Sequence, residues 1–324
     1  MSIITNTGKV KEIFANVNGE KKKIESAWAK VNGEVMKLFG TLGEGFVAVG
    51  LGDSYYSTDG QTWEAMSGSN TTSFYGVAFG KNVIVAVGTY NTTGRIYYST
   101  DGKTWTKASG ISSANYYGVT YANGKFIAVG ASGTVSLSDD GKTWSNISVG
   151  TTDTLWNVTL INDLLFAGSS GKFFTSTDGI EWDVISFDSS YKFESIAYGN
   201  GMYVAIRNIS NSYYSTDGKT WTKIAYDSTL GYVGGYAIKY FNNRFICIGR
   251  KEYYYSHDGI TWYKESWLDE ENYYYGLAVG KDILVAVGQN GSVAYSTDGV
   301  EWNKGTGLTS SITYKSVCFF NSND

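Results

Sequence analysis

Proline is absent from this chain of 324 residues, histidine occurs once and cysteine twice. Without proline, the turns must depend on glycine, asparagine and aspartate, which enter left-handed backbone conformations most readily. His257 has no second histidine and no cysteine pair at ligand spacing, so we expect no zinc site and no Ser-His-Asp triad. Cys247 and Cys318 lie in apolar stretches and are too few for a disulfide framework. We interpret them as small buried apolar side chains, with one disulfide left open.

Charge is also scarce, because only 17% of the residues are charged and the net charge is −4. A nucleic-acid-binding surface is basic, so this balance argues against a nucleic-acid partner. No stretch approaches the roughly 18 consecutive apolar residues of a membrane-spanning helix, so we expect no membrane insertion. Residues 1–9 lack the apolar core of a signal peptide, so we do not expect export through the Sec pathway.

The chain is rich in tyrosine (27) and glycine (40), and it repeats a heptapeptide of the form S-x-D-G-x-x-W. In the copy at 99–105, Asp101-Gly102 is a turn pair, and Trp105 can anchor the returning strand in an apolar layer. Each copy therefore predicts the tip of a β-hairpin. There are seven copies, whose aspartates are Asp59, Asp101, Asp140, Asp178, Asp217, Asp258 and Asp298.

The tryptophans that end these heptapeptides are 38 to 42 positions apart. A fixed period in this range is typical of solenoids and propellers, and a four-stranded blade needs about 40–45 residues. In the third repeat, residues 117–121, 125–129, 134–137 and 143–147 predict four strands, A to D. The B strands are nearly continuously apolar, which indicates packing on both faces. The predicted fold class is therefore all-β, a seven-bladed β-propeller of four-stranded blades.

The two ends of the repeat array are out of phase with the blades. Before the first heptapeptide there is a B strand at 46–49 and a C strand at 54–56, but no A strand. After the last one, residues 314–320 match an A strand that no B strand follows. Pairing the two ends would complete one blade and close the ring, which protects the strand edges. We therefore predict one closed propeller over 41–324, preceded by a separate hairpin segment at 1–40.

The heptapeptide resembles the Asp-box, also called the bacterial neuraminidase repeat, which occurs in sialidases, sortilin-like receptors, photosystem assembly factors and some glycanases. The resemblance covers the chain from about residue 41 to the end. It implies a propeller with each box at the turn between the third and fourth strands of a blade, far from any active centre. The seven aspartates are therefore expected to be structural. The resemblance implies little about function, because unrelated functions share the motif.

An enzymatic role can be weighed on the residues that it would need. Sialidases hold the substrate carboxylate with three arginines and use an aspartate acid/base with a Tyr/Glu pair, and their F/Y-R-I-P motif requires proline. The four arginines, Arg95, Arg207, Arg244 and Arg250, all lie away from the predicted channel positions. Glycanases need two carboxylates roughly 5–10 Å apart, and only Glu194 is at such a position. We expect no enzyme activity, catalytic residue, cofactor or metal; a glycan-processing enzyme is kept as an alternative.

Ligand sites of propellers favour the face that carries the D-to-A loops, opposite the boxes. The first residue of each A strand should line the channel there, which gives Tyr75, Tyr117, Trp156, Glu194, Tyr236, Tyr275 and Lys315 as candidate ligand-binding residues. The D-to-A loops add Tyr116, Tyr191, Tyr232, Tyr273 and Tyr274. Exposed tyrosine and tryptophan offer a large contact area at low entropic cost, and sugars stack on such rings. The alternative, left open, is that these aromatics pack between blades.

Residues 1–40 contain a short duplication, because 15–24 and 29–38 each carry V-N-G between β-prone runs. Asn-Gly in this setting predicts a hairpin turn. Two small hairpins are too little to fold alone, so they must dock on the propeller, on sister copies or on another protein. Seven lysines against four glutamates give this segment a charge of +3, for which a solvated basic face is the plain interpretation.

This tandem segment resembles N-terminal pieces of tail and minor structural proteins in phages of Gram-positive hosts. The resemblance implies a structural or adhesion protein of a phage or phage-tail-like particle, made in the host cytoplasm and located in the virion. Residues 1–40 would attach it to other tail or baseplate proteins, and the propeller would contact a host-surface glycan or protein. A homo-oligomer is left open. The alternative function is a cytoplasmic scaffold or assembly-factor propeller.

Overall fold

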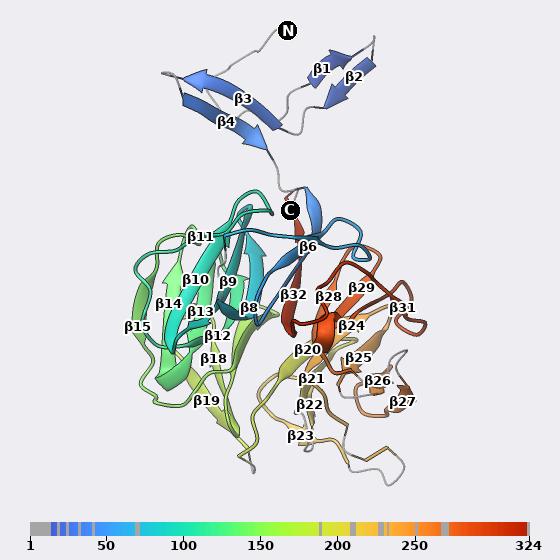
Figure 1. Ribbon diagram of the computed structural model, residues 1–324. Coiled ribbons are helices and arrows are strands. Elements are labelled where there is room, and N and C mark those ends of the chain that lie inside the picture. Colours follow the sequence, from blue (N-terminus) through green and yellow to red (C-terminus); the bar gives the residue numbers. More distant parts are fainter. Residues whose placement is uncertain are drawn as a thin grey trace.

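The computed structural model describes residues 43–68, 72–187, 190–207, 212–225, 230–231, 233–249, 252–266 and 272–322, together with the backbone of four strands before residue 43 (Figure 1). Within these ranges the chain is almost entirely β-structure. The helical elements described are two 3-10 turns, η1 (Ala131–Gly133) and η2 (Gln289–Gly291). Among the described residues, no helix has the length and apolar character needed to span a membrane.

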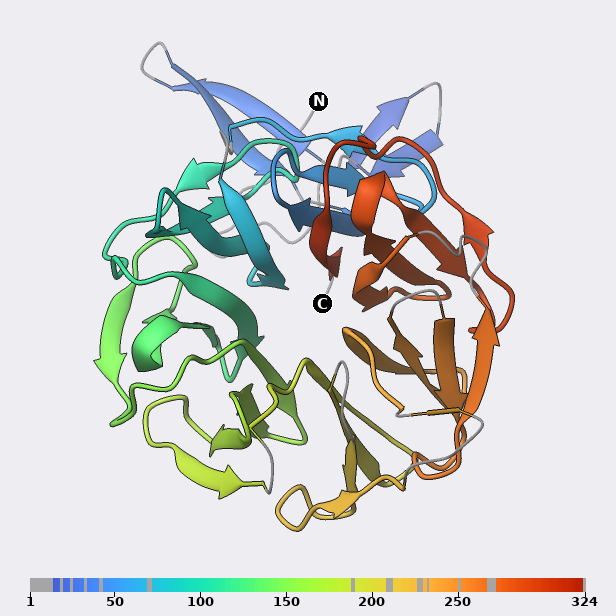
Figure 2. The same cartoon turned by 60° about the horizontal axis from the view of Figure 1, so that its bottom comes forward.

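Seven four-stranded antiparallel sheets form the blades of a closed propeller. Figure 2 shows the sheets arranged in a ring. We number the blades in chain order, beginning with the one that joins both ends of the array. Blade 1 contains β32 (Tyr314–Asn321), β5 (Glu44–Gly50), β6 (Tyr55–Ser57) and β7 (Glu64–Ala65). Blade 2 contains β8 (Ser73–Gly80), β9 (Val83–Tyr90), β10 (Thr93–Ser99) and β11 (Thr106–Lys107). Blade 3 contains β12 (Tyr116–Ala122), β13 (Lys125–Gly130), β14 (Thr134–Ser138) and β15 (Ser145–Ser148).

The remaining blades repeat this order from the innermost to the outermost strand. Blade 4 contains β16 (Asn157–Ile161), β17 (Leu164–Gly168), β18 (Lys172–Ser176) and β19 (Asp183–Ser186). Blade 5 contains β20 (Ser195–Gly199), β21 (Met202–Ile206), β22 (Tyr213–Ser215) and β23 (Thr222–Lys223). Blade 6 contains β24 (Ala237–Phe241), β25 (Arg244–Ile248), β26 (Glu252–Ser256) and β27 (Tyr263–Ser266). Blade 7 contains β28 (Tyr274–Val279), β29 (Leu284–Gly288), β30 (Val293–Ser296) and β31 (Asn303–Lys304).

The predicted closure is confirmed, because β32 pairs with β5 across 270 residues of sequence. The register places Val317 opposite Ala48 and Phe319 opposite Phe46. The second strands of the blades are the most buried, and adjacent blades share apolar layers. Val47 of blade 1, for example, belongs to the same buried cluster as Ile84 of blade 2. The core is therefore a series of layers between neighbouring blades, which explains why the second strands are apolar on both faces.

All seven boxes adopt one hydrogen-bonded turn between the third and fourth strands. In the box of blade 3, the Ser138 hydroxyl donates to the Asp140 carboxylate at 3.1 Å and accepts the Gly141 amide at 2.8 Å. The same carboxylate oxygen accepts the amides of Lys142 and Thr143, at 2.8 and 2.9 Å. The equivalent bonds are present in the other six boxes. Each aspartate therefore caps its own turn.

The cysteines and the box tryptophans lie in or beside the apolar layers. Cys247 and Cys318 are both free thiols, so the alternative of a disulfide between them is wrong. Cys247 is fully buried in β25, and burial raises the pKa of the Cys318 thiol in β32 to about 12. Five box tryptophans are buried, while Trp182 and Trp221 are half-buried.

Two short hairpins precede the propeller, as the duplication predicts. β1 (Phe14–Val17) pairs with β2 (Glu20–Lys23), and β3 (Ser26–Val31) pairs with β4 (Glu34–Gly40). The two Asn-Gly turns lie outside the described residues. The propeller begins at Gly43, next to Glu44, which pairs with Asn321 at the far end of β32 from Lys315. The chain therefore enters the ring on the face opposite the one where the innermost strands begin.

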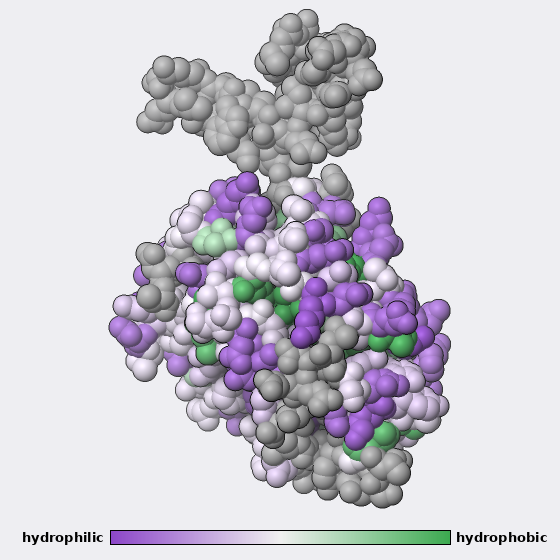
Figure 3. Space-filling model, turned by 45° about the vertical axis from the view of Figure 1, so that its right-hand side comes forward, coloured by the Kyte–Doolittle hydropathy of each residue, from purple (hydrophilic) through white to green (hydrophobic). Residues whose placement is uncertain are grey.

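The outer wall of the ring is mainly polar. Figure 3 shows hydrophilic residues over most of one side and hydrophobic residues only in small separate patches. Exposed apolar residues such as Val184 and Ile260 are scattered over different blades. Among the described residues, this side exposes no broad apolar patch.

Candidate functional site

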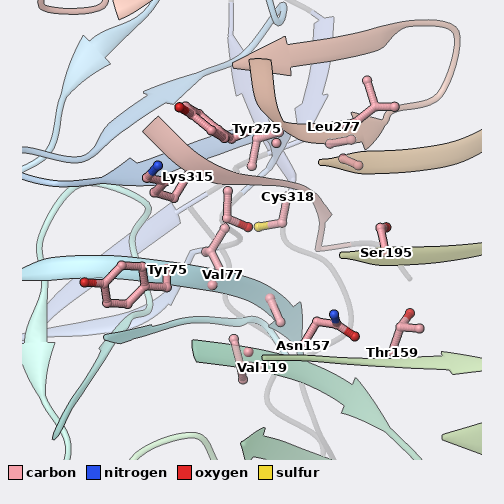
Figure 4. A pocket seen from close by; sticks show the side chains of 18 of the residues that line it. Tyr75, Val77, Val119, Asn157, Thr159, Ser195, Tyr275, Leu277, Lys315 and Cys318 are labelled. Carbon is pink, nitrogen blue, oxygen red and sulfur yellow. The ribbon is translucent and has the colours of Figure 1, made fainter. Parts of the chain in front are cut away.

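The centre of the ring holds a cavity of about 820 Å³. All seven residues predicted from the starts of the A strands line it: Tyr75, Tyr117, Trp156, Glu194, Tyr236, Tyr275 and Lys315. Figure 4 shows Lys315 beside Tyr275 and Tyr75 in this lining. The volume lies within the range of small-molecule sites, which is about 300–1,000 Å³.

In blades 1, 2, 3 and 7 a β-bulge presents the cavity residue. In blade 3, Tyr116 pairs with Gly130 and Gly118 pairs with Val129, so Tyr117 is the extra residue between them. The strand register shifts in the same way around Tyr75, Tyr275 and Lys315, so each of them is also the extra residue of a bulge. A bulge re-aims the side chain of the extra residue. The facing glycine is required by close approach, since a Cβ on Gly130 would lie 2.0 Å from the Asn115 carbonyl oxygen.

In blades 4, 5 and 6 the cavity residue comes directly before the innermost strand and is held by a backbone hydrogen bond. The amide of Trp156 donates to Gly168 at 2.8 Å, and that of Glu194 donates to Ile206 at 3.0 Å. Asn157 adds a link between blades, because its side-chain amide donates to the carbonyl oxygens of Phe193 and Glu194 at 2.7 and 3.1 Å. Asn157 therefore fixes the backbone at Glu194.

The aromatic residues form two arcs around the cavity. The first arc is Tyr75, Tyr117 and Trp156. The ring centroid of Tyr117 lies 5.5 Å from that of Tyr75 and 4.8 Å from that of Trp156. The second arc is Tyr236 and Tyr275, whose ring centroids are 4.7 Å apart; Tyr273 packs against both rings but does not line the cavity. The residues are half-buried. The two interpretations left open by the sequence therefore combine: the rings contact neighbouring blades and also border the cavity.

Charged side chains separate the two arcs. On one side, Lys192 lies 3.1 Å from the Glu194 carboxylate and places its ammonium 5.1 Å from the Trp156 ring centroid. On the other side, the Lys315 ammonium lies 3.6 Å from the Tyr275 ring centroid. Lys239 of β24 also lines the cavity. Three lysines and one carboxylate make this lining positive in an otherwise acidic chain.

The pKa shifts follow from burial and from these neighbours. Burial raises the pKa of Glu194, and the positive charges of Lys192 and Lys315 offset part of that rise. Burial lowers the pKa of Lys315, and the charge of Lys192 lowers it further, while Glu194 raises it. Burial alone lowers the pKa of Lys239. The mutual effects place Lys192, Glu194 and Lys315 in one electrostatic unit at the cavity.

The five tyrosines predicted in the D-to-A loops lie in different surroundings. Tyr116 and Tyr274 are fully buried directly before the bulges, so their prediction as recognition residues is wrong. Tyr273 stacks on Tyr275 without lining the cavity, and Tyr191 is half exposed. Tyr232 lies outside the described residues. Lys192, Lys239 and Asn157 were missed, although Lys192 stands only two residues before Glu194 in the sequence.

The described lining contains few side chains that could act as acids or as metal ligands. Glu194 is the single carboxylate in the described lining of the cavity. Within the described ranges, no group of three or more histidine, cysteine, aspartate or glutamate side chains could hold a metal ion. The aspartates of the boxes lie at the opposite ends of the blades, where the third strands end, and their carboxylates are engaged by their own turns.

No family model matches the chain, and no curated protein matches it. Solved structures share its fold. YCF48 bound to D1 peptide is 16% identical, with a TM-score of 0.61 over 79% of this chain and 95% of that one. YCF48 from Cyanidioschyzon merolae is 16% identical, with a TM-score of 0.59 over 87% of this chain and 92% of that one. Virginiamycin B lyase from Staphylococcus aureus is 11% identical, with a TM-score of 0.62 over 74% of this chain and 86% of that one.

At these identities the likeness shows the propeller fold alone. The names of these neighbours point to different functions. The fold is therefore consistent with a scaffold or binding role but does not identify the function. The resemblances to the Asp-box family and to phage tail proteins gain no support from these comparisons. The turn geometry of the seven boxes is established by their hydrogen bonds and does not depend on family membership.

Proposed function

We propose that this chain is a binding protein and that its central cavity holds a saccharide. The observation that carries the proposal is the pair of aromatic arcs that border one cavity. Planar tyrosine and tryptophan rings provide apolar faces for the C–H surfaces of sugar rings, and they lose little entropy on binding.

Two polar atoms in the same lining suit a hydroxylated ligand. The Trp156 indole N–H and one Glu194 carboxylate oxygen are buried without a hydrogen-bond partner among the described residues. A buried polar atom without a partner is costly, so a shift of either side chain towards a ligand that supplies hydroxyl groups would be favourable. The indole would donate to a ligand oxygen, and the carboxylate would accept from a ligand hydroxyl.

The lining also argues for binding without turnover. A glycoside hydrolase needs two carboxylates flanking the scissile bond, and the described lining offers Glu194 alone. A peptide is the second candidate occupant, because one structural neighbour is described as bound to a peptide. A cytoplasmic scaffold or assembly-factor role would fit that occupant.

We extend the proposal to residues 1–40 as an attachment segment of a phage or phage-tail-like particle, with the cavity facing a host-surface glycan. The support is the resemblance of the tandem hairpins and the position of Gly43 at the opposite end of β32 from Lys315. In the described backbone, β1 pairs with β2 and β3 with β4, and no third strand joins either sheet. Isolated hairpins are only marginally stable in water, so partner strands would stabilise them.

The test of saccharide binding is an array of neutral and acidic glycans probed with the full chain and with the double variant Tyr117→Ala, Trp156→Ala. We expect the parent to retain glycans and the double variant to lose them. The double variant Tyr56→Ala, Tyr98→Ala is the control, because both rings lie under lysines near the boxes. Retention that is unchanged in the cavity variant, or turnover of a bound glycan, would contradict the proposal.

The attachment role is tested by comparing the full chain with residues 41–324 by light scattering and by incorporation into particles. The full chain should associate or incorporate through its hairpins, and residues 41–324 should remain monomeric. Equal association of both forms would exclude residues 1–40 as the attachment segment.

A further inference from the structure

The lining charges restrict the kind of saccharide that the cavity can take. Four charged residues line the cavity, and three of them are lysines. Only one of these lysines, Lys192, has a carboxylate within ion-pair distance among the described residues. Lys315 instead rests its ammonium on the face of Tyr275. The cavity therefore carries more positive than negative charge before any ligand is bound.

Resting on the proposed function, we infer that the ligand is an anionic saccharide whose acidic group binds at Lys315 and Lys192. The acidic group is a carboxylate or a phosphate, which share the acceptor oxygens that an ammonium requires. Lys315 belongs to blade 1 and Lys192 to the loop between blades 4 and 5, so they flank the two gaps between the aromatic arcs. They are close enough for the charge of Lys192 to lower the pKa of Lys315. A sugar ring on either arc would place its substituents towards these ammonium groups.

The positions of the lysines explain why an anion is favoured over a neutral sugar. Lys315 is half-buried and part of its hydration is replaced by the Tyr275 ring. A cation over an aromatic face keeps its outer side available for an anion. The low-dielectric walls strengthen any charge pair formed inside the cavity relative to one in water. Lys239, on β24, adds a third lysine to the same lining.

The inference can be tested with three related sugars: methyl glucoside, glucuronate and glucose 6-phosphate. The readout is the indole N–H signal of Trp156 in nitrogen-correlated NMR spectra of the full chain, identified by its loss in Trp156→Phe. Trp156 lines the cavity, so a sugar that binds against its ring changes the surroundings of the indole and will move this signal. Titration of each sugar then gives a dissociation constant for this cavity.

We expect one or both acidic sugars to bind about tenfold more tightly than methyl glucoside, the effect of one charge-assisted hydrogen bond. Lys315→Met should remove that preference, so that the acidic sugars bind this variant no more tightly than methyl glucoside does. Lys315→Arg should retain the preference, which separates loss of charge from loss of packing. Lys103→Met is the control: it makes the same change in net charge at a box, where the ammonium lies over Tyr56. Lys103→Met should leave the affinities for all three sugars, and the preference among them, unchanged.

The outcomes separate the two proposals. Equal affinity for all three sugars overturns the anionic preference and leaves saccharide binding intact. A preference that survives Lys315→Met and Lys192→Met also overturns it. If no sugar moves the Trp156 signal, both proposals fail, and they fail equally if a pentaglutamate peptide moves it while the sugars do not. A stronger response to glucuronate or to glucose 6-phosphate identifies the acidic group as carboxylate or phosphate.

Discussion

Closure of the ring by β32 should dominate the stability of the propeller, and Phe320→Ala is the sharpest probe of it. The Phe320 side chain is 3% exposed and packs in the apolar layer between blades 1 and 2, with its ring centroid 6.0 Å from that of Phe79. Removing a buried phenylalanine costs about 3–5 kcal/mol, because transfer free energy is lost and a cavity remains. For a large domain this corresponds to a fall of roughly 5–10 °C in melting temperature.

The assay is thermal unfolding followed by circular dichroism, with Val184→Ala as the control. Val184 is 53% exposed, so its truncation should change the melting temperature by about 1 °C or less. A chain that ends at residue 313 loses Tyr314, Val317 and Phe320 together, all of them buried. That loss approaches the whole stability of an ordinary domain, about 5–15 kcal/mol, so this chain should show no cooperative melt. A parent-like melt for either Phe320→Ala or the truncated chain would refute the mixed blade as the closing element.

Three further predictions concern single carboxylates. Asp101→Ala should lower the free energy of unfolding by about 1–2 kcal/mol, since the turn amides lose their acceptor, and saccharide binding should be unchanged; loss of binding at unchanged stability would make the box a ligand site. Hydrogen bonds from Thr62 and Gln61 outweigh the opposing effect of burial and lower the pKa of Asp59 from 3.8 to about 2. The contribution of the ionised Asp59 to stability is therefore complete above about pH 4–5 and is lost as the pH falls towards 2. Acid titrations of the melting temperature should show this loss in the parent chain but not in Asp59→Asn. Protonation of Glu194, whose pKa burial raises, removes the negative charge of the cavity, so affinity for an acidic sugar should rise as the pH falls through that pKa; a Glu194→Gln variant with the same pH dependence would contradict this.

The sequence by itself determined the number of blades, their phase and the closure of the ring. Each box is a local device, in which the Asp101 carboxylate accepts the amides two and three residues further along the chain. Hydrogen bonds between residues two or three positions apart depend only on the local sequence, so they can be predicted from it. The spare A strand at the C-terminus and the missing one near residue 46 followed from the same periodicity, and β32 pairs with β5 accordingly.

The sequence also placed the seven cavity residues correctly on the cavity wall, because each stands at the start of an A strand. It could not distinguish between adjacent tyrosines. Tyr116 is buried and Tyr117 borders the cavity, and the same division separates Tyr274 from Tyr275. The β-bulge that decides between them depends on the facing strand, where Gly130 permits the close approach.

Only the tertiary structure decided the electrostatics of the cavity. Lys192 and Lys239 occupy unrelated places in their repeats, one before β20 and the other within β24, yet both line the wall with Lys315. The shifted pKa values of Glu194 and Lys315 arise first from burial, and then from charges that include pairs more than 100 residues apart in sequence, Lys315 with Glu194 and Lys315 with Lys192. Local hydrogen bonds and periodic burial leave a pattern in the order of residues. Desolvation and charge pairing across a ring leave none, because they depend on distances that exist only after the seven blades have closed.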